Sequence, residues 1–500
     1  MKSGLGLALG VVLSLCAGGA PAAAEGSDPS RSIVKLYVTT VMRDVTSPWR
    51  GGWGYPVTGS GAVIAGGRIL TAAHVVNDQT FVVVRLNGTA RKARARVRFV
   101  SHAADLALLE VDDASFLEGV PPLELGDLPA LRDEVAAYGF PNGGETLSIT
   151  EGVVARVEHW RYVHSQESLL AIQMDAAIDP GSSGGPLVRD GRLVGVAMQG
   201  FKDSAIGCAV PAPLVRHFLD DVADGRLDGI PELGLRWQGL ESATLKASLQ
   251  VPPGGTGVLL TRVGAAPAGD VLREGDVLLS IGGKDVADDG TVVLREGERT
   301  DLSHAADLLP LGASVPVRYL RDGAVRTAEV RLLRARGEGD LVPRLFDRNA
   351  DWFIFGGLGF VTLTRNFLET AKESAPPRHA ALAEREPRWP GEEVILLADL
   401  LVSEVNTGYQ DRRLKVVRAV DGREVRDIAG LARLVERPDG GPLVVFSLED
   451  GSRVTVDRAQ AVATAAEVLA RYEVATDRSA RLAALAGTKQ AAAAPGAGAQ

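Results

Sequence analysis

The chain has 500 residues, of which 46% are hydrophobic, so it can bury several cores and is not a disordered polypeptide. Its formal net charge is −9, and its basic residues form no cluster interleaved with aromatic residues. This composition excludes nucleic acid and anionic membranes as the main partner. The length predicts about three domains.

Residues 1–24 have the layout of a secretory signal peptide, with Lys2, an apolar stretch and a small-residue cleavage site before Glu25. We therefore expect export, to the periplasm first and to the exterior as the alternative. Bulky Leu15 precedes Cys16, so lipidation of Cys16 is discounted. No later apolar run is long enough to cross a bilayer, and no integral membrane segment is expected after cleavage.

Cleavage would leave Cys208 as the single cysteine of the mature chain. An internal disulfide is then impossible, and buried area or association must provide stability. Cys208 lies in an apolar run, where packing in a core is expected rather than a reactive thiol.

Short β-branched runs separated by turns extend from Ser32 to about Val210 and predict an antiparallel sandwich or barrel. A helical pattern follows and ends at Gly225. Residues 271–286 predict a turn, a buried strand and a glycine hairpin, followed by a helix over 301–310. Residues 414–436 repeat this order more weakly, which indicates a diverged internal repeat. The Ala/Gly-rich tail, 485–500, is expected to be disordered.

Three segments of the β-rich region carry residues suited to nucleophilic catalysis. "LTAAHVV" contains His74, "AADLALLEV" contains Asp105, and "DPGSSGGPL" contains Ser183 between glycines. A serine nucleophile needs a histidine base, a carboxylate that orients the imidazole, and backbone donors for the oxyanion. Each segment alone also fits an ordinary turn or loop. Their order along one domain is that of chymotrypsin-like double barrels.

"TAAHVV", "DLALLEV" and "GSSGGPLV" resemble the three signatures of the HtrA family of serine proteases, also called Deg or Do-like proteases. Longer segments, including "DWFIFGGLGF", are similar to the plant-type Deg branch. The resemblance implies a mainly β fold: a chymotrypsin-like double β-barrel at 30–224, then PDZ-like α+β domains at 230–336 and 345–470.

By the same resemblance His74, Asp105 and Ser183 form the triad, although Ser182 stands where the family usually has asparagine. The backbone amides of Gly181, Ser182 and Ser183 are the expected oxyanion donors. The position six residues before the nucleophile is Ala177 rather than an aspartate. The walls of the specificity pocket are expected from Ala177, Ile178, Met198, Gln199 and Gly200. Such an uncharged pocket predicts cleavage after small or medium aliphatic residues, although these side chains also suit barrel packing.

PDZ domains bind extended peptides at a sheet edge. In the first, Leu233, Gly234 and Leu235 resemble a loop that binds a terminal carboxylate, and an ordinary linker turn is the alternative. In the second, "GLGF" from Gly357 matches the loop motif, yet assembly is expected rather than peptide capture. Family members form trimers or hexamers, and the aromatic segment 47–56 is either a contact between subunits or a surface loop.

The predicted function is an exported, ATP-independent serine endopeptidase that acts on misfolded or unstructured proteins and is regulated through its PDZ domains and oligomerisation. The alternative is a conditionally closed or inactive protease fold that serves as a peptide-binding chaperone. The remaining histidines show no metal-ligand spacing and no P-loop is present, so neither a metal nor another cofactor is expected.

Overall fold

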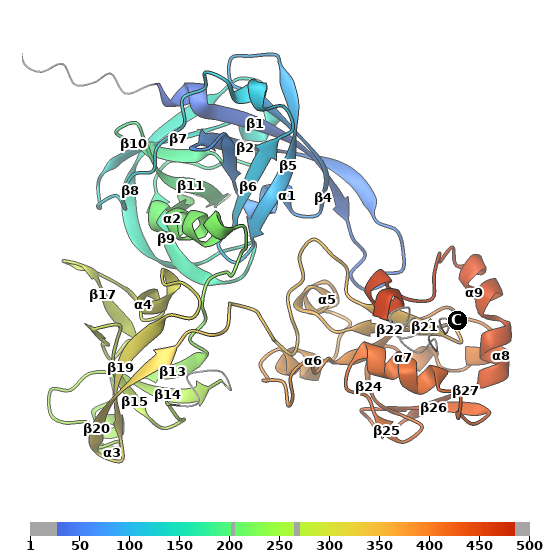
Figure 1. Cartoon of the computed structure of the whole chain (residues 1–500). Helices are drawn as coiled ribbons and strands as arrows, with labels where there is room; N and C mark the ends of the chain where they lie inside the picture. The colour runs from blue at the N-terminus through green and yellow to red at the C-terminus, as the bar shows by residue number, and fades with distance from the viewer. Residues whose placement is uncertain (1–27, 202–205, 265–270, 486–500) are drawn as a thin grey trace, which may run out of the picture.

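The computed structural model describes residues 28–201, 206–264 and 271–485. The expected signal peptide with Cys16, and residues 486–500 of the expected tail, lie outside these ranges. Figure 1 shows an N-terminal pair of barrels with two smaller sheet units, one from the middle and one from the last part of the chain.

The first barrel is closed, with the strand order β1-β2-β3-β6-β5-β4. Its elements are β1 (Ile33–Met42), β2 (Trp53–Ile64), β3 (Arg68–Thr71), α1 (Ala73–Val76), β4 (Gln79–Leu86), β5 (Lys92–Ser101) and β6 (Leu106–Val111). β1 pairs with β2 along its whole length and with β4 on its other side. Closure leaves no unpaired edge in this unit.

The second barrel is also closed, with the order β10-β11-β12-β9-β8-β7. Its elements are β7 (Glu134–Gly139), β8 (Ser148–Arg161), β9 (Ser168–Met174), β10 (Pro186–Arg189), β11 (Arg192–Gly200), β12 (Gly207–Pro211) and α2 (Ala212–Asp221). The helix ends near Gly225, which has a φ of 90° that favours glycine. The expected double β-barrel is therefore confirmed.

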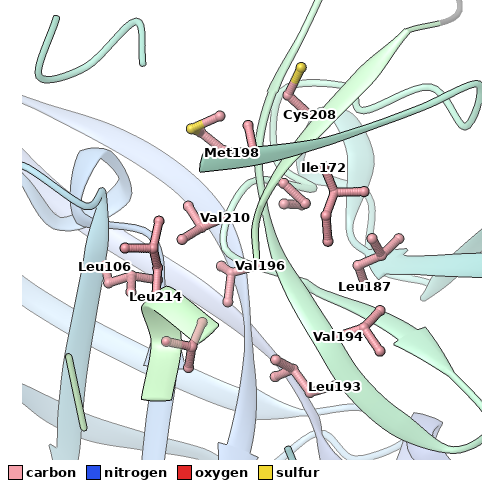
Figure 2. Close-up of a cluster of buried hydrophobic side chains, with 14 of the residues drawn as sticks. Leu106, Ile172, Leu187, Leu193, Val194, Val196, Met198, Cys208, Val210 and Leu214 are labelled. Atoms are coloured by element: carbon pink, nitrogen blue, oxygen red, sulfur yellow. The ribbon is translucent and has the colours of Figure 1, made fainter. Parts of the chain in front are cut away.

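The second barrel has an apolar core that also reaches the first barrel through Leu106. Figure 2 shows this cluster, in which Met198 of β11 and Cys208 of β12 lie among aliphatic side chains. Cys208 is fully buried, and burial raises the pKa of its thiol to about 12. The thiol is therefore a packing group, as its apolar sequence context indicated.

The middle unit is an antiparallel sheet with the order β13-β14-β15-β19-β20, and a separate hairpin. Its elements are β13 (Leu235–Gly239), α3 (Ala243–Ser248), β14 (Val258–Val263), β15 (Val277–Ile281), β16 (Lys284–Asp285), β17 (Thr291–Arg295), β18 (Glu298–Asp301), α4 (His304–Asp307), β19 (Ser314–Arg321) and β20 (Ala324–Arg331). The helix expected over 301–310 is shorter, because β18 continues to Asp301 and Pro310 follows the helix.

The last unit contains a sheet with the order β21-β22-β23-β24-β26-β27. Its elements are β21 (Trp352–Phe355), β22 (Leu358–Thr362), α5 (Arg365–Thr370), α6 (Pro377–Leu382), β23 (Ile395–Leu400), β24 (Lys415–Val420), β25 (Arg423–Glu424), α7 (Ile428–Glu436), β26 (Leu443–Leu448), β27 (Arg453–Asp457), α8 (Arg458–Ala463) and α9 (Ala465–Arg471). The run β24, β25, α7 repeats the order β15, β16, α4, with the β17–β18 hairpin inserted only in the middle unit.

The aromatic segment before β2 contacts the last unit of its own chain. Trp49 is buried, and its ring lies 6.1 Å from that of Trp352 in an edge-on arrangement. It also packs against the backbone of Gly359. Trp49 is therefore an intramolecular contact, whereas Trp53 leaves 61% of its surface exposed.

Candidate active site

The pairing of β3 with β6 brings His74 and Asp105 together. His74 lies in α1, immediately after β3, and Asp105 immediately precedes β6, which pairs with β3 through Thr71 and Ala107. The Nδ1 atom of His74 lies 2.8 Å from Oδ2 and 3.0 Å from Oδ1 of Asp105. The backbone N–H of His74 also donates to Oδ1 at 2.9 Å. The carboxylate thus fixes both the imidazole and its backbone.

Burial and charge act in opposite directions on this pair. Burial alone would lower the pKa of His74, but the charge of Asp105 and its hydrogen bond outweigh burial and raise that pKa above 6.5. Burial would likewise raise the pKa of Asp105, but the charge and hydrogen bonds of His74 lower it. Asp105 therefore stays ionised and can stabilise an imidazolium.

Asp105 has a left-handed backbone conformation, with a φ of 54°. Aspartate tolerates this region better than most residues, yet the conformation needs support from its surroundings. Its N–H donates to the carbonyl oxygen of His102 at 3.1 Å, which closes the turn between β5 and β6. This turn sets the direction in which the carboxylate leaves the backbone.

The Ser183 loop contacts the same region from the second barrel. The carbonyl oxygen of Ser183 accepts a hydrogen bond from the Ser60 N–H at 2.9 Å. A Cβ atom at Gly184 would lie 2.1 Å from Oγ1 of Thr71 and 2.8 Å from the Ala72 nitrogen. The loop is therefore close to the segment that leads into His74. In the described residues no hydrogen bond joins Ser183 Oγ to His74, so the role of Ser183 stays a prediction.

Residues Asp179 to Ser182 form a tight turn, closed by a hydrogen bond of 2.9 Å from the Ser182 N–H to the Asp179 carbonyl. Pro180 occupies the second position and Gly181, with a φ of 96°, the third, as in a type II turn. The Pro180 carbonyl accepts from the Asn142 N–H at 2.6 Å. Because C=O and N–H of a trans peptide point in opposite directions, the Gly181 N–H is turned away from Asn142.

This turn corrects the expected set of oxyanion donors. The Ser182 N–H is already engaged by Asp179 inside the turn, so the prediction that it serves the oxyanion is wrong. Within the described residues, no hydrogen bond engages the N–H of Gly181 or of Ser183. Gly181 and Ser183 remain the candidate donors.

Sequence reasoning missed the residue that joins this loop to the first barrel. Ser60 in β2 is fully buried, and its hydroxyl donates to the Gly181 carbonyl at 2.7 Å while accepting from the Phe140 N–H at 2.9 Å. Its own carbonyl accepts from the Thr71 hydroxyl at 2.7 Å. The sequence offers no signal for this role, because the partners lie in segments far apart along the chain.

A second unforeseen support holds the segment that contains Asn142. Lys35 in β1 is 1% exposed, and its Nζ donates to the Gly143 carbonyl and to Glu145, both at 2.7 Å. These two hydrogen bonds are charge-assisted, and they compensate for the burial of the Lys35 ammonium group. It fixes the loop whose Asn142 amide orients the Pro180–Gly181 peptide.

The structure brings part of the expected specificity pocket together. A Cβ atom at Gly200 would lie 2.1 Å from the Ile178 carbonyl oxygen, so these two segments are in contact. Ala177 is exposed beside them, and Met198 is buried in the core of the second barrel (Figure 2). The Gln199 side chain accepts a hydrogen bond from the Val163 N–H at 3.0 Å, which directs it toward the loop after β8.

In the middle unit, the expected carboxylate loop borders a cavity of about 780 Å³ between the units. Leu233 is buried, whereas Gly234 and Leu235 line the cavity beside several arginines, including Arg262 and Arg334. The Gly234 carbonyl accepts from the Gly264 N–H at 2.8 Å. Acidic residues line the same cavity, and Arg334 already pairs with two of them, Glu232 and Glu386. The cavity wall therefore carries both signs of charge.

In the last unit, the "GLGF" run begins at the hairpin turn between β21 and β22. Gly356 and Gly357 have φ values of 57° and 74°, and β22 is paired with β21 on one side and β23 on the other. No edge of β22 is free to receive a peptide strand.

Two further findings concern the whole described region. No helix in residues 28–201, 206–264 and 271–485 is long and apolar enough to span a membrane. In those same ranges, no group of three or more His, Cys, Asp or Glu side chains is placed to hold a metal ion.

Comparison with known proteins shows the family of the chain. A family model of a trypsin-like peptidase domain matches residues 59–196, and one of a PDZ domain matches residues 342–481. The chain is 34% identical to the putative mitochondrial protease Do-like 3 of Arabidopsis thaliana, over 89% of this chain and 78% of that protein. It is 35% identical to chloroplastic protease Do-like 2 of the same plant, over 92% and 77%. The solved HtrA-type protease AlgW with a tripeptide is 25% identical with a TM-score of 0.49, over 62% of this chain and 96% of that one.

Proposed function

Because the chain belongs to the HtrA/Deg family of Do-like serine proteases, we propose that it is an ATP-independent endopeptidase that cleaves misfolded or unstructured proteins after small or medium aliphatic residues. The observation that carries this proposal is the contact between His74 and buried, ionised Asp105, next to the Ser183 loop. The uncharged side chains of Ala177 and Ile178 support the choice of residue before the cleaved bond.

The proposed reaction is acyl transfer. His74 takes the Ser183 hydroxyl proton as the oxygen attacks the peptide carbonyl, and Asp105 stabilises the imidazolium. The N–H groups of Gly181 and Ser183 stabilise the oxyanion. His74 then protonates the leaving amine, and water releases the acyl group from Ser183.

Digestion of casein by the purified chain and by its Ser183→Ala variant tests this function. We expect the parent to degrade casein and the variant to retain only background cleavage. Mass mapping of the fragments reports the residue before each cut. Equal digestion by both proteins would refute the catalytic role of Ser183, and cuts after lysine or arginine would refute the proposed specificity.

The second candidate function is a closed or inactive protease fold that acts as a peptide-binding chaperone. The absence of a hydrogen bond between Ser183 and His74 in the described residues favours this candidate in the resting state. It predicts that the parent prevents aggregation of a denatured protein without cleaving it. The casein experiment separates the two candidates.

We propose that the middle unit is the first of two PDZ domains, spanning 230–336, and that 345–470 is the second. The cavity beside Gly234 supports binding of a peptide carboxylate by the first. The paired edges of β22 support an assembly role for the second. Calorimetry with peptides bearing a free or an amidated C-terminus tests the first assignment.

Oligomerisation to a trimer or hexamer is also part of the proposal. Exposed Trp53 and Tyr55 at the start of β2 are suited to contact a second copy. Light scattering on the parent and a Trp53→Ser variant tests this surface.

For the location, we propose export through residues 1–24 to the periplasm, with secretion as the alternative. Relatives named as mitochondrial and chloroplastic make an organelle leader the competing candidate. N-terminal sequencing of the mature protein locates the cleavage site.

A further inference from the structure

The segment between the middle and last units contacts the first barrel close to Asp105. We define Phe346 and Asp347 as the linker hook. The Phe346 ring stacks on the His102 ring, with centroids 4.1 Å apart and planes 9° apart. The Asp347 carboxylate lies 2.9 Å from Nε2 of His102 and accepts from the Asp78 N–H at 2.6 Å. Phe346 of the linker hook therefore contacts the face of the His102 ring, and Asp347 contacts one of the ring nitrogens.

His102 belongs to the turn that sets the conformation of Asp105. Its carbonyl oxygen accepts the Asp105 N–H, and this hydrogen bond closes the turn in which Asp105 has a left-handed φ. On the far side of the turn, Ser165 Oγ donates to the Ala103 carbonyl at 3.1 Å. The turn is held between the second barrel and the linker hook.

His164 completes the contact with the catalytic side chains. Its Nε2 lies 2.9 Å from Nδ1 of His102, and its ring centroid lies 6.2 Å from that of His74. Burial lowers the pKa of His164 to about 4, so it is a neutral hydrogen-bonding group at neutral pH. An unbroken series of contacts thus leads from the linker hook to His74.

The hook is anchored to the last unit. The Leu345 N–H donates to the Asn366 side chain at 2.8 Å, and the Asn366 amide donates back to the Leu345 carbonyl at 3.0 Å. Asn366 lies in α5, and Arg344 pairs with Glu369 of the same helix. A shift of α5 would move Phe346 and Asp347 with it.

We propose that Phe346 and Asp347 are positioning residues for the catalytic site, through which the last unit holds the His102–Asp105 turn in its productive conformation. This inference rests on the proposed triad and goes beyond it. It places a determinant of the turnover rate outside the double barrel. Small displacements of a catalytic group have large effects on rate, which is why a contact two residues removed from the chemistry matters.

The test uses the full chain with a fluorogenic peptide and titration of the active serine by a fluorophosphonate. The Phe346→Ala/Asp347→Ala variant is expected to lose about tenfold in kcat per titrated site, with KM within about twofold of the parent. Phe346→Tyr with Asp347→Asn is expected to regain much of the rate, since it keeps the ring and an acceptor. Asp322→Ala is the matched control, because Asp322, like Asp347, is an aspartate with a left-handed backbone, the two φ values being 52° and 57°.

Hydrogen exchange of residues 102–106 gives a readout that is independent of catalysis. The Asp105 amide is expected to exchange faster in the double variant than in the parent and the control. Unchanged kcat per site, increased kcat, or loss of titratable sites alone would each overturn the inference. If the parent shows no Ser183-dependent turnover, the proposed function fails. The inference is then tested by hydrogen exchange alone, and equal exchange at the Asp105 amide in the parent and the double variant would overturn it.

Discussion

At the scale of single residues, one buried hydroxyl joins the two barrels at the candidate active site. The Ser60 side chain bonds to the Gly181 carbonyl and to the Phe140 N–H, and its backbone N–H bonds to Ser183. Gly181 and Phe140 are buried, so neither can exchange Ser60 for water without a rearrangement. The Ser60 contacts therefore fix the Asp179–Ser182 turn and Ser183 against the first barrel.

Ser60→Ala is expected to lower kcat by roughly ten- to hundredfold and to cost about 1–3 kcal/mol of unfolding free energy, because Phe140 loses its acceptor and Gly181 its donor. Ser242→Ala, which removes the cap of α3 in the middle unit, is the matched control. Steady-state kinetics and denaturant unfolding measure both effects. A variant that is destabilised yet has parental kcat would show that Ser60 does not position the turn.

The pH dependence follows from the His74–Asp105 pair. A general base must be neutral, so activity appears as pH rises through the His74 pKa, which Asp105 raises above 6.5. We expect the acid limb of kcat/KM above pH 6.5. Asp105→Asn is expected to reduce kcat by roughly 10³- to 10⁴-fold and to move the residual limb to lower pH. An unmoved limb would contradict the electrostatic role of Asp105.

The triad candidates could be predicted from the sequence because each stands in a short, distinctive segment. The contacts of Ser60, Lys35 and Asn142 could not, since they join segments that meet only in the folded barrels. The prediction for Ser182 failed for a local reason. The Pro180–Gly181 turn uses the Ser182 N–H to close itself.

At the scale of elements, α4 of the middle unit docks on β8 and β9 through a buried polar network. His159 Nε2 lies 2.7 Å from Asp307, and Arg336 pairs with Asp307 at 2.6 Å and with Glu167 at 3.2 Å. Asp307 and the His159 side chain are almost fully buried. Removing one partner of such a network leaves an uncompensated charge.

Arg336→Met is therefore expected to undock the middle unit from the double barrel. Small-angle scattering should show a larger radius of gyration, and the connecting segment 225–232 should be cut faster by an added protease. Arg331→Met on exposed β20 is the matched control. Identical scattering for Arg336→Met and the parent would contradict the role of this network.

The same network predicts an effect of acid on docking. Burial would raise the pKa of Asp307, but Arg336 and His159 outweigh it and lower that pKa below 3.8. A group whose folded pKa is lowered stabilises the docked form above its unfolded pKa, and this stabilisation is lost as pH falls through the folded pKa. Scattering measured from pH 7 down to pH 3 should show an increase in the radius of gyration only below pH 3.8. Expansion already at pH 6 would contradict this assignment.

Periodicity and turn residues predicted most strands and the repeated strand–turn–helix order. They overestimated α4, because β18 and Pro310 limit it from both sides. α4 contributes the charged residue Asp307 to the docking contact, and no pattern distinguishes such a residue from one exposed to solvent.

At the scale of the whole molecule, side-chain contacts join the double barrel to both smaller units. Trp49 packs on the last unit, the linker hook packs on His102, and Asp307 pairs with His159. The order of the units along the chain could be predicted from the sequence. Their mutual placement could not, because it depends on side chains that look like ordinary surface residues.

Fluorophosphonate labelling of the full chain, followed by mass mapping, tests whether Ser183 is a nucleophile activated by His74. We expect the probe to attach to Ser183 in the parent, and labelling to be abolished in Ser183→Ala and strongly slowed in His74→Ala. Labelling of Ser182 instead, or an unlabelled parent in the presence of a PDZ-binding peptide, would contradict this expectation.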